Sequence, residues 1–299
     1  MPSKPDFARH GFGIGLYLAG VALFAANDAL GKWLVGDYSV AQLLFVRSVG
    51  AIAVLVPIML VTRTSLKMSG DWGLHVLRIL CQTADSYCFY FATWRLPLAD
   101  VMTFYMAAPI ILTAISGLVL GERVGPYRWG AVIIGFVGVV IALAPTDAAF
   151  SVGSLIALIG ATFFAISLAM TRKLRDNHPL PLVTWQFIGS GLIGASLCPL
   201  GWVTPGPLDL GLMLILGIVA GGCFLLITRA LALAPASLLA PFQYSAIFWA
   251  GMFGWLIWLD TPTPRILLGN VILIGSGLFV FYRERRLSVS VSDKVEQIP

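Results

Sequence analysis

Charged residues are scarce in this chain of 299 residues. Lys, Arg, Asp and Glu together make up 11% of it, whereas a typical soluble domain carries about 25%. Hydrophobic residues make up 59%, and the mean hydropathy is +0.91. This composition argues against an ordinary soluble domain and indicates a membrane protein.

Cysteine and histidine are also rare, and this limits the chemistry available to the chain. The four cysteines, Cys81, Cys88, Cys198 and Cys223, all fall inside apolar stretches and show neither a disulfide framework nor the spacing of metal ligands. The sequence "ALGKW" has a Gly-Lys pair but lacks the upstream glycine of a phosphate-binding loop. We therefore predict no catalytic residue, no metal and no cofactor. A membrane-embedded enzyme, a channel and a scaffold remain as alternatives.

Ten apolar stretches fill almost the whole chain. Each approaches the length of about 20 residues that a helix needs to cross the hydrocarbon core. The stretches are continuously apolar rather than alternating, so helices are predicted and not a barrel. The predicted spans are Phe12–Val35, Ser39–Thr62, Trp72–Trp94, Ala99–Leu120, Tyr127–Ala144, Val152–Leu174, Leu180–Trp202, Leu208–Leu231, Ala236–Leu259 and Arg265–Tyr282.

The positive charges lie mostly on one side of this arrangement. If the N-terminus is cytoplasmic, fifteen of the nineteen Lys and Arg residues fall on the inner side, and only Lys32, Arg95 and Arg265 on the outer side. This is the bias of inner-membrane proteins, and it predicts that both termini are cytoplasmic. The same placement argues against binding of nucleic acid, despite a net charge of +5.

The second half of the chain repeats the first about 140 residues later. "GVALFAANDALGKW" in the first stretch resembles "GATFFAISLAMTRK" in the sixth, so that Gly20 corresponds to Gly160. The charges of matching loops are inverted, with Lys32 alone after the first stretch but Arg172, Lys173 and Arg175 after the sixth. A duplicated block of five helices must insert upside down relative to its copy. We therefore expect an all-α membrane protein made of two inverted five-helix repeats, at 12–144 and 152–282, and a disordered cytoplasmic tail at 283–299.

The segment "LPLADVMTFYMAAPIILTAISGLVLGERVGPYRWGAVIIGFVGVVIAL" resembles the closing helix pair of the EamA units in the drug/metabolite transporter superfamily. The resemblance extends from Gly11 to Tyr282, although the second copy has "WLDTPTPR" where the first has "LGERVGPYR". Within the superfamily the chain resembles ten-helix metabolite exporters, including aromatic amino-acid exporters of the YddG type. The resemblance implies a secondary transporter in the inner membrane that exports amino acids. Import, or transport of another metabolite or a cationic drug, is the alternative.

Polar side chains within the predicted spans indicate where a transport pathway runs, because charge that faces lipid is unfavourable. His75, Arg78, Gln82 and Asp85 share one face of the third span, and the first two lie near its inner end, where they could extend to the interface. Asp28, Arg47 and Asp85 lie at similar depth, so we expect Arg47 to bridge one or both carboxylates. This charge cluster is a structural ion network, a site of substrate or proton coupling, or a group at the outer membrane interface with no special role.

The remaining candidates offer amide, hydroxyl and aromatic groups to a solute. They are Asn27, Gln82, Tyr105, Ser167, Trp185, Gln186, Gln243 and Tyr244. Aromatic walls with few charges suit a small neutral or zwitterionic metabolite. The predicted partners are therefore such a metabolite, most simply an amino acid, and membrane lipid, and the protein is expected to be a monomer or a homodimer.

Overall fold

The computed structural model describes residues 4–108, 111–112, 115, 126–143, 151–174, 177–233, 242, 245–272, 274–276, 278–279 and 282. This part of the chain contains helices and no strand, as predicted. The helices are α1 (Lys4–Leu34), α2 (Val40–Val61), α3 (Trp72–Arg95), α4 (Leu98–Tyr105), α6 (Pro126–Leu143), α7 (Val152–Lys173), α8 (Pro179–Leu197), the short 3-10 helix η1 (Cys198–Leu200), α9 (Pro207–Leu233) and α11 (Ser245–Trp258). A further apolar helix spans Pro264–Ser276.

Local sequence explains where several helices begin. The side chains of Ser39, Asp71 and Ser151 accept hydrogen bonds from the first-turn N–H groups of α2, α3 and α7, which have no partner within the helix. α2, α3, α6, α7 and α9 begin and end within two residues of the predicted spans. The first membrane span, Gly11–Leu34, also lies within one residue of its prediction, although the helix that contains it begins at Lys4.

The fourth span differs most from its prediction. One span with a kink at Pro109, either static or a gating bend, was expected over Ala99–Leu120. Instead α4 ends at Tyr105, and Met106 and Ala107 form a turn. Pro109 has no N–H to bond the carbonyl of Tyr105, four residues earlier, which favours an interruption here. Pro109 itself, and most of the chain up to residue 125, lie outside the described residues.

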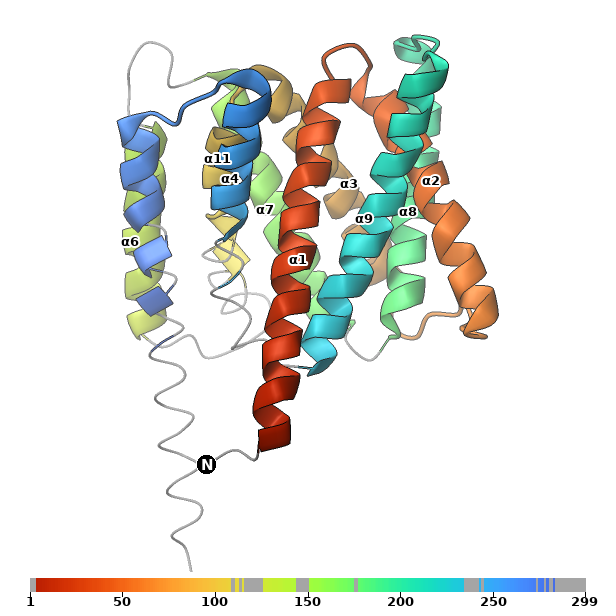
Figure 1. The fold of residues 1–299 in the computed structure, drawn as a ribbon, viewed down its shortest axis with the longest axis horizontal. Coiled ribbons are helices and arrows are strands. Elements are labelled where there is room, and N and C mark those ends of the chain that lie inside the picture. Colours follow the sequence, from red (N-terminus) through yellow and green to blue (C-terminus); the bar gives the residue numbers. More distant parts are fainter. Residues whose placement is uncertain are drawn as a thin grey trace, which may run out of the picture.

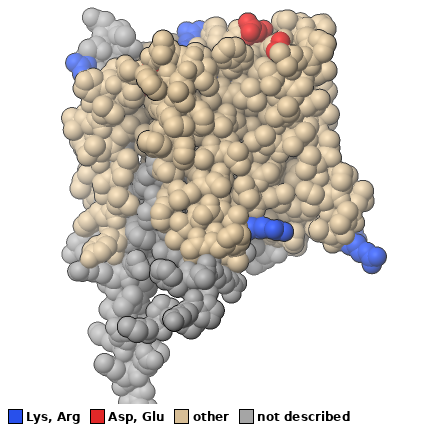
Figure 2. All heavy atoms as spheres, viewed as in Figure 1, with Lys and Arg blue, Asp and Glu red and all other residues tan. Residues whose placement is uncertain are grey.

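The helices have the length and polarity of membrane spans. Five are long and apolar enough to cross a bilayer, namely Gly11–Leu34, Val40–Val61, Val152–Thr171, Pro179–Leu200 and Pro207–Ile227, and two shorter helices are also apolar. Figure 2 shows charged atoms only near the upper and lower edges of the visible face, with an uncharged band between them. Such a band is what a surface in contact with lipid requires.

The main helix contacts join the first half of the chain to the second. α1 packs along α9, α3 along α7, α2 against α8 and α9, and α4 against α11. Exchanging the two halves converts the α1–α9 contact into the α7–α3 contact, as expected for a duplicated fold. Figure 1 shows α6 apart from this core, at one edge of the bundle. The interior of the molecule is therefore the interface between the two repeats.

Small residues permit these close contacts. A Cβ atom at Gly217 of α9 would collide with the backbone carbonyl oxygen of Arg47, and one at Gly50 of α2 would collide with that of Leu214. A Cβ at Gly194 of α8 would lie 2.8 Å from the carbonyl oxygen of Ala41. Within lipid no hydrophobic effect drives helices together, so such backbone approach is a main source of helix association.

Candidate functional site

A chain of buried hydrogen bonds crosses the interface between the repeats. Tyr105 donates its hydroxyl to Asp85 Oδ1 at 2.7 Å, and Gln82 donates Nε2 to Asp85 Oδ2 at 2.7 Å. Ser167 then donates its hydroxyl to Gln82 Oε1 at 2.9 Å. This Asp85 network, made of Gln82, Asp85, Tyr105 and Ser167, connects α3 and α4 of the first half with α7 of the second. It brings together four of the residues that the sequence indicated.

The helices fix the geometry of the Asp85 network. Gln82 and Asp85 are three residues apart on α3, so their side chains lie on one helix face. Tyr105 is the last residue of α4, directly before the interruption. Across from it, Gly160 of α7 provides the space for the Tyr105 hydroxyl, because a Cβ atom there would collide with that oxygen. Both carboxylate oxygens of Asp85 thus accept from neutral donors.

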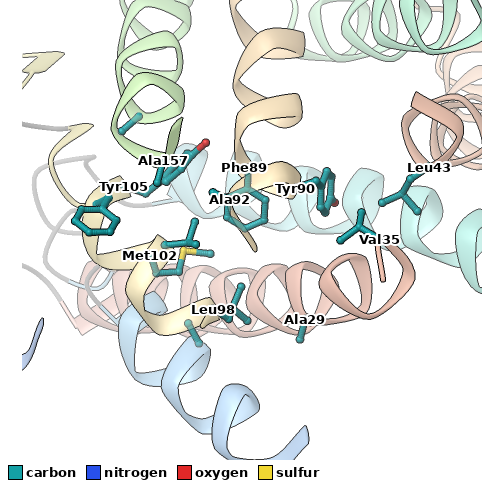
Figure 3. Packing of buried hydrophobic residues seen from close by; sticks show 14 of the residues in the cluster. Ala29, Val35, Leu43, Phe89, Tyr90, Ala92, Leu98, Met102, Tyr105 and Ala157 are labelled. Atoms are coloured by element: carbon teal, nitrogen blue, oxygen red, sulfur yellow. The ribbon is translucent and has the colours of Figure 1, made fainter. Parts of the chain in front are cut away.

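A row of aromatic rings runs beside the Asp85 network. The ring centroids of Tyr90 and Phe89 are 5.4 Å apart, those of Phe89 and Tyr105 are 5.3 Å apart, and those of Tyr105 and Phe164 are 6.3 Å apart. Figure 3 shows Phe89 and Tyr90 within the packed core. This aromatic row, consisting of Tyr90, Phe89, Tyr105 and Phe164, offers flat apolar faces next to polar groups.

Arg47 of α2 does not make the predicted bridge. Its Nη1 donates to the hydroxyl of Tyr90 at 2.8 Å, and its guanidinium lies 5.7 Å from the ring centroids of both Tyr90 and Phe187. Within the described part of the chain, no carboxylate forms an ion pair with it. The expectation that Arg47 directly bridges Asp28 or Asp85 was therefore wrong; Arg47 contacts Tyr90, and the neutral donors Tyr105 and Gln82 bond to Asp85.

Asn27 and Asp28 lie on α1, close to Arg47 and the Asp85 network. Both are buried, with 3% and 8% of their surface exposed. Among the described residues Asn27 Oδ1 has no hydrogen-bond partner. The charges of Asp28, Arg47 and Asp85 still act on one another. The three charged residues thus form one neighbourhood without a direct ion pair between them.

Trp185 and Gln186 of α8 lie apart from the Asp85 network. Trp185 donates Nε1 to the carbonyl of Leu66 at 3.0 Å, in the connection between α2 and α3, and its ring contacts Trp72. Gln186 donates to Thr83 at 3.5 Å, while its Oε1 is buried without a partner in the described part. The other two candidates, Gln243 and Tyr244, lie outside the described residues.

The Trp185 contact has a counterpart at the opposite end of the molecule. At the start of α2, Gln42 donates Nε2 to the carbonyl of Val203 at 2.7 Å and accepts from Val203 N at 3.0 Å. α2 corresponds to α8 in the repeat, and the connection after α8 corresponds to the one after α2. Trp185 and Gln42 thus hold equivalent connections at opposite ends, which assigns Trp185 an anchoring position.

His75 and Arg78 do not extend to the interface. His75 is fully buried, and a ring nitrogen contacts the carbonyl of Ser69 at 3.0 Å. Arg78 is also buried, and its Nη2 donates to the carbonyl of Leu182 at 2.7 Å. Both side chains therefore link the N-terminal part of α3 to neighbouring backbone. Sequence spacing identified their common face but not that α8 covers it.

A groove of about 550 Å³ lies between α3, α7 and α8, separate from the polar groups of the Asp85 network. Its lining is apolar and includes Leu77, Leu80, Phe163, Ile193 and Leu197. Three of these, Leu77, Leu80 and Leu197, are exposed large hydrophobic residues. In a membrane protein such a surface faces lipid.

Four contact residues were not predicted as site residues. Tyr90 and Phe187 surround Arg47, and no spacing pattern distinguishes them from other core aromatic residues. Lys32 and Asp260 form an ion pair at 3.1 Å. The topology predicts both at the outer side with opposite charge, so this pair could have been anticipated.

Two repeated helical halves with a polar network buried at their interface define a duplicated membrane transport protein. The comparison with known families agrees. The EamA-like transporter family matches residues 11–144 and again residues 151–282, and the chain belongs to this family. It is therefore a multi-pass inner-membrane transporter of small metabolites within the drug/metabolite transporter superfamily, and not an enzyme.

Named relatives transport different compounds. A riboflavin transporter of Vibrio cholerae is 30% identical over 244 residues, which cover 80% of this chain and 81% of the relative. An S-adenosylmethionine uptake transporter of Rickettsia bellii is 24% identical over 93% of this chain and 96% of its own. A pseudopaline exporter of Pseudomonas aeruginosa is 27% identical over 87% and 93%.

A solved crystal structure shares the fold of this chain. It has a TM-score of 0.66 at 17% sequence identity and covers 93% of this chain and 99% of its own. Fold similarity at such low identity carries no information on the transported compound.

Proposed function

We propose that this protein is a secondary, alternating-access carrier for zwitterionic amino-acid-like metabolites, aromatic amino acids among them. In this proposal ten helices cross the membrane, both termini are cytoplasmic and the solute is exported. The observation that carries the proposal is the Asp85 network, since it joins α3 and α4 of one repeat to α7 of the other. A site whose ligands come from both repeats must change when the repeats move against each other, as alternating access requires.

The chemistry around the Asp85 network supports the class of solute. A guanidinium and two carboxylates, on Arg47, Asp28 and Asp85, supply both signs of charge. The aromatic row supplies flat apolar surface next to them. A solute that carries a carboxylate, an ammonium group and an apolar side chain has a complement for each part.

The relatives favour a second candidate substrate. S-adenosylmethionine, which the Rickettsia bellii relative takes up, is itself an α-amino acid joined to an aromatic base. The same three chemical parts would bind it, and in that case the direction would be uptake. Export is supported by the resemblance to metabolite exporters and by the pseudopaline exporter among the relatives.

Counterflow in proteoliposomes tests the proposal. Vesicles are loaded with an unlabelled solute, and entry of the labelled solute is measured for phenylalanine, tryptophan, methionine, S-adenosylmethionine and riboflavin. We expect saturable counterflow of the zwitterions, and loss of most of this flux in Gln82→Ala. Ser196→Ala is the matched control, because Ser196 is exposed on α8 and bonds only its own helix. Saturable counterflow of riboflavin alone would reject the zwitterion class, and linear flux would reject a carrier.

A further inference from the structure

Arg47 carries a charge that the described part of the protein does not neutralise by contact. It lies on α2 about two turns from the outer end of the helix, at a depth where a charge is unfavourable. A guanidinium has five N–H donors in a planar fork. The hydroxyl of Tyr90 accepts one of them, at 2.8 Å, and the only ion pair of the described residues lies elsewhere.

The surroundings of Arg47 direct its free donors toward the interior. The rings of Tyr90 and Phe187, both at 5.7 Å from the guanidinium, are buried, with 1% and 7% exposed. Arg47 itself is half-buried. The guanidinium therefore lies beside buried rings of α3 and α8, on the side of α2 that packs against other helices.

The position of the Tyr90 ring is itself specified by the fold. A Cβ atom at Gly31 of α1 would collide with that ring, so α1 can approach Tyr90 only because residue 31 is glycine. One turn earlier on the same helix lies Asp28, whose charge acts on Arg47 and on Tyr90. α1, α2, α3 and α8 thus converge on the guanidinium, and three of them belong to the first repeat and one to the second.

We infer that Arg47 binds the carboxylate of the transported solute, and that Asp28 faces its ammonium group. The solute's side chain then lies along the aromatic row. The inference rests on the proposed function and names the residue that selects α-carboxylates among amphipathic amines. A fork of N–H donors matches a carboxylate in a bidentate manner, which an ammonium cannot do.

A purely structural part for Arg47 does not account for these contacts. The Tyr90 hydroxyl is neutral and accepts one N–H, which leaves the charge and most donors unmatched. A structural clamp would be expected to pair with a carboxylate, but among the described residues no carboxylate forms an ion pair with Arg47. A solute can bring the carboxylate that these residues do not supply.

Competition experiments on the unmodified protein test the inference first. Counterflow of labelled phenylalanine is measured with phenylalanine, phenylalanine amide and phenethylamine as competitors. We expect the two compounds without a carboxylate to compete at least about tenfold more weakly, since a site built for a charged group rejects an analogue that lacks it. Equal competition would overturn the inference while leaving the carrier proposal intact. No phenylalanine flux at all would instead contradict the proposed function.

Substitution then assigns the discrimination to Arg47. We expect Arg47→Gln to reduce the preference for phenylalanine over phenethylamine by at least about tenfold, and Arg47→Lys, which keeps the charge but loses the fork, to reduce it less. Arg95→Gln is the matched control, because it removes an exposed guanidinium at the outer end of α3. An unchanged preference in folded Arg47→Gln would overturn the assignment. If Arg47→Gln fails to fold, Arg47→Lys decides in the same way.

A second and independent observation concerns the outer end of the molecule. Lys32, near the end of α1, forms the ion pair with Asp260 at 3.1 Å and also lies 4.5 Å from the ring centroid of Trp258. Lys32 is 11% exposed and Asp260 28%, so the pair is partly shielded from solvent. Asp100 at the start of α4 acts on both charges. The pair therefore fastens the first repeat to the second at the outer side.

We propose that the Lys32–Asp260 pair is the outer gate of the carrier and that it must break before the site opens outward. Cys223 of α9 provides a native reporter, because it is buried and near Asp28. With Cys81, Cys88 and Cys198 replaced by alanine, an impermeant thiol reagent is applied from outside to intact cells. We expect Lys32→Gln to speed labelling of Cys223 by about tenfold, corresponding to 1.4 kcal/mol.

Charge reversal distinguishes pairing from a general loosening. The double variant Lys32→Asp with Asp260→Lys should return labelling of Cys223 toward the original rate, whereas each single reversal should speed it. Arg265→Gln is the matched control, since it removes an exposed positive charge at the same end. Unchanged labelling in Lys32→Gln, or no recovery in the double variant, would overturn the gate.

Discussion

At the scale of single residues, the Asp85 network depends on groups that are small or neutral. Gly160 has no side chain where the Tyr105 hydroxyl must lie, and Asp85 is held by two neutral donors rather than by a cation. Removal of one group therefore need not remove the others. This allows folding and transport to be separated by choice of substitution.

Gly160→Ala should disrupt the Asp85 network by crowding. The added Cβ would collide with the Tyr105 hydroxyl and lie 2.8 Å from Cys88 Cβ. Overpacking of this kind costs about 1–3 kcal/mol. We expect reduced folded protein and strongly reduced counterflow. Adding Tyr105→Phe should restore part of the folded yield, measured by size-exclusion chromatography, but not the counterflow, because Asp85 still lacks that donor.

The comparison for Gly160→Ala is Gly222→Ala, at a position where a Cβ would meet no atom within 4 Å. Normal yield and normal transport are expected of Gly222→Ala. If Gly160→Ala transports as well as this control, the hydroxyl position is not required.

Asp85→Asn and Asp85→Ala should differ in stability. An asparagine can donate to Gln82 once the Gln82 amide is rotated, and its oxygen still accepts from Tyr105. The rotated Gln82 amide then donates to the Ser167 hydroxyl, which now accepts instead of donating, so Gln82, Tyr105 and Ser167 each keep a partner. Alanine leaves the Tyr105 hydroxyl and the Gln82 amide unsatisfied, which costs about 1–3 kcal/mol. We expect the thermal denaturation midpoint of purified Asp85→Asn to stay near the original and that of Asp85→Ala to fall.

The pH dependence of flux in Asp85→Asn then separates the two hypotheses for the charge cluster. A coupling role predicts that the dependence is lost, and a structural role predicts that it is kept. Equal midpoints for Asp85→Asn and Asp85→Ala would show that the hydrogen bonds of Asp85 do not stabilise the fold.

At the scale of helices, close backbone approach is the main restriction. Gly217→Ala should be severe, because its Cβ would collide with the carbonyl oxygen of Arg47, which belongs to the backbone of α2 and cannot rotate away. We expect α2 and α9 to separate. The free energy of unfolding should fall by more than about 1 kcal/mol, and less folded protein should be recovered. Gly211→Ala on the same helix, which meets no atom within 4 Å, should fold normally. Equal yields of the two variants in detergent would contradict the described contact.

Sequence alone predicted helices better than it predicted side-chain partners. Span length and apolar character are local properties, so α2, α3 and α7 were located within a residue or two. Pro109 indicated a kink in the fourth span, but not that α4 ends at Tyr105, because a proline inside an apolar run is compatible with either a bend or a break. The ten-helix count remains a prediction, since several spans lie partly outside the described residues.

For polar residues, too, the sequence predicted the helix face but not the side-chain partner. Periodicity gave the face shared by Gln82 and Asp85 and so the centre of the Asp85 network. It could not give the neighbour across that face, which is why Arg47 was assigned to a carboxylate and not to Tyr90. Trp185 shared the polar and aromatic character of a solute contact, yet its partner is the carbonyl of Leu66. Depth follows from the sequence, whereas the identity of the neighbouring helix depends on packing.

At the scale of the whole molecule, the repeats predict the orientation in the membrane. Asp37, between α1 and α2, and Lys67, between α2 and α3, are both exposed and lie at opposite ends of α2. In a cysteine-free background we expect Asp37→Cys to react with an impermeant reagent on intact cells and Lys67→Cys to react only after the membrane is opened. The reverse pattern would invert the topology and place both termini outside.

The contact between α2 and α8 joins two equivalent helices of the repeats. Exchanging the repeats turns α2 into α8 and α8 into α2, so the same helix pair results. Gly191 and Gly194 bring α8 against Ser48 and the backbone of α2. Because the same pair of helices would form this interface in both states, we expect it to contribute similarly to the inward-open and the outward-open carrier. Exchanging the repeats does not convert the Lys32–Asp260 pair into itself. As the proposed outer gate, this pair favours the state that is closed to the outside. Substitutions between α2 and α8 should therefore change the amount of folded protein. Substitutions at Lys32 should instead change the ratio of inward-open to outward-open carrier.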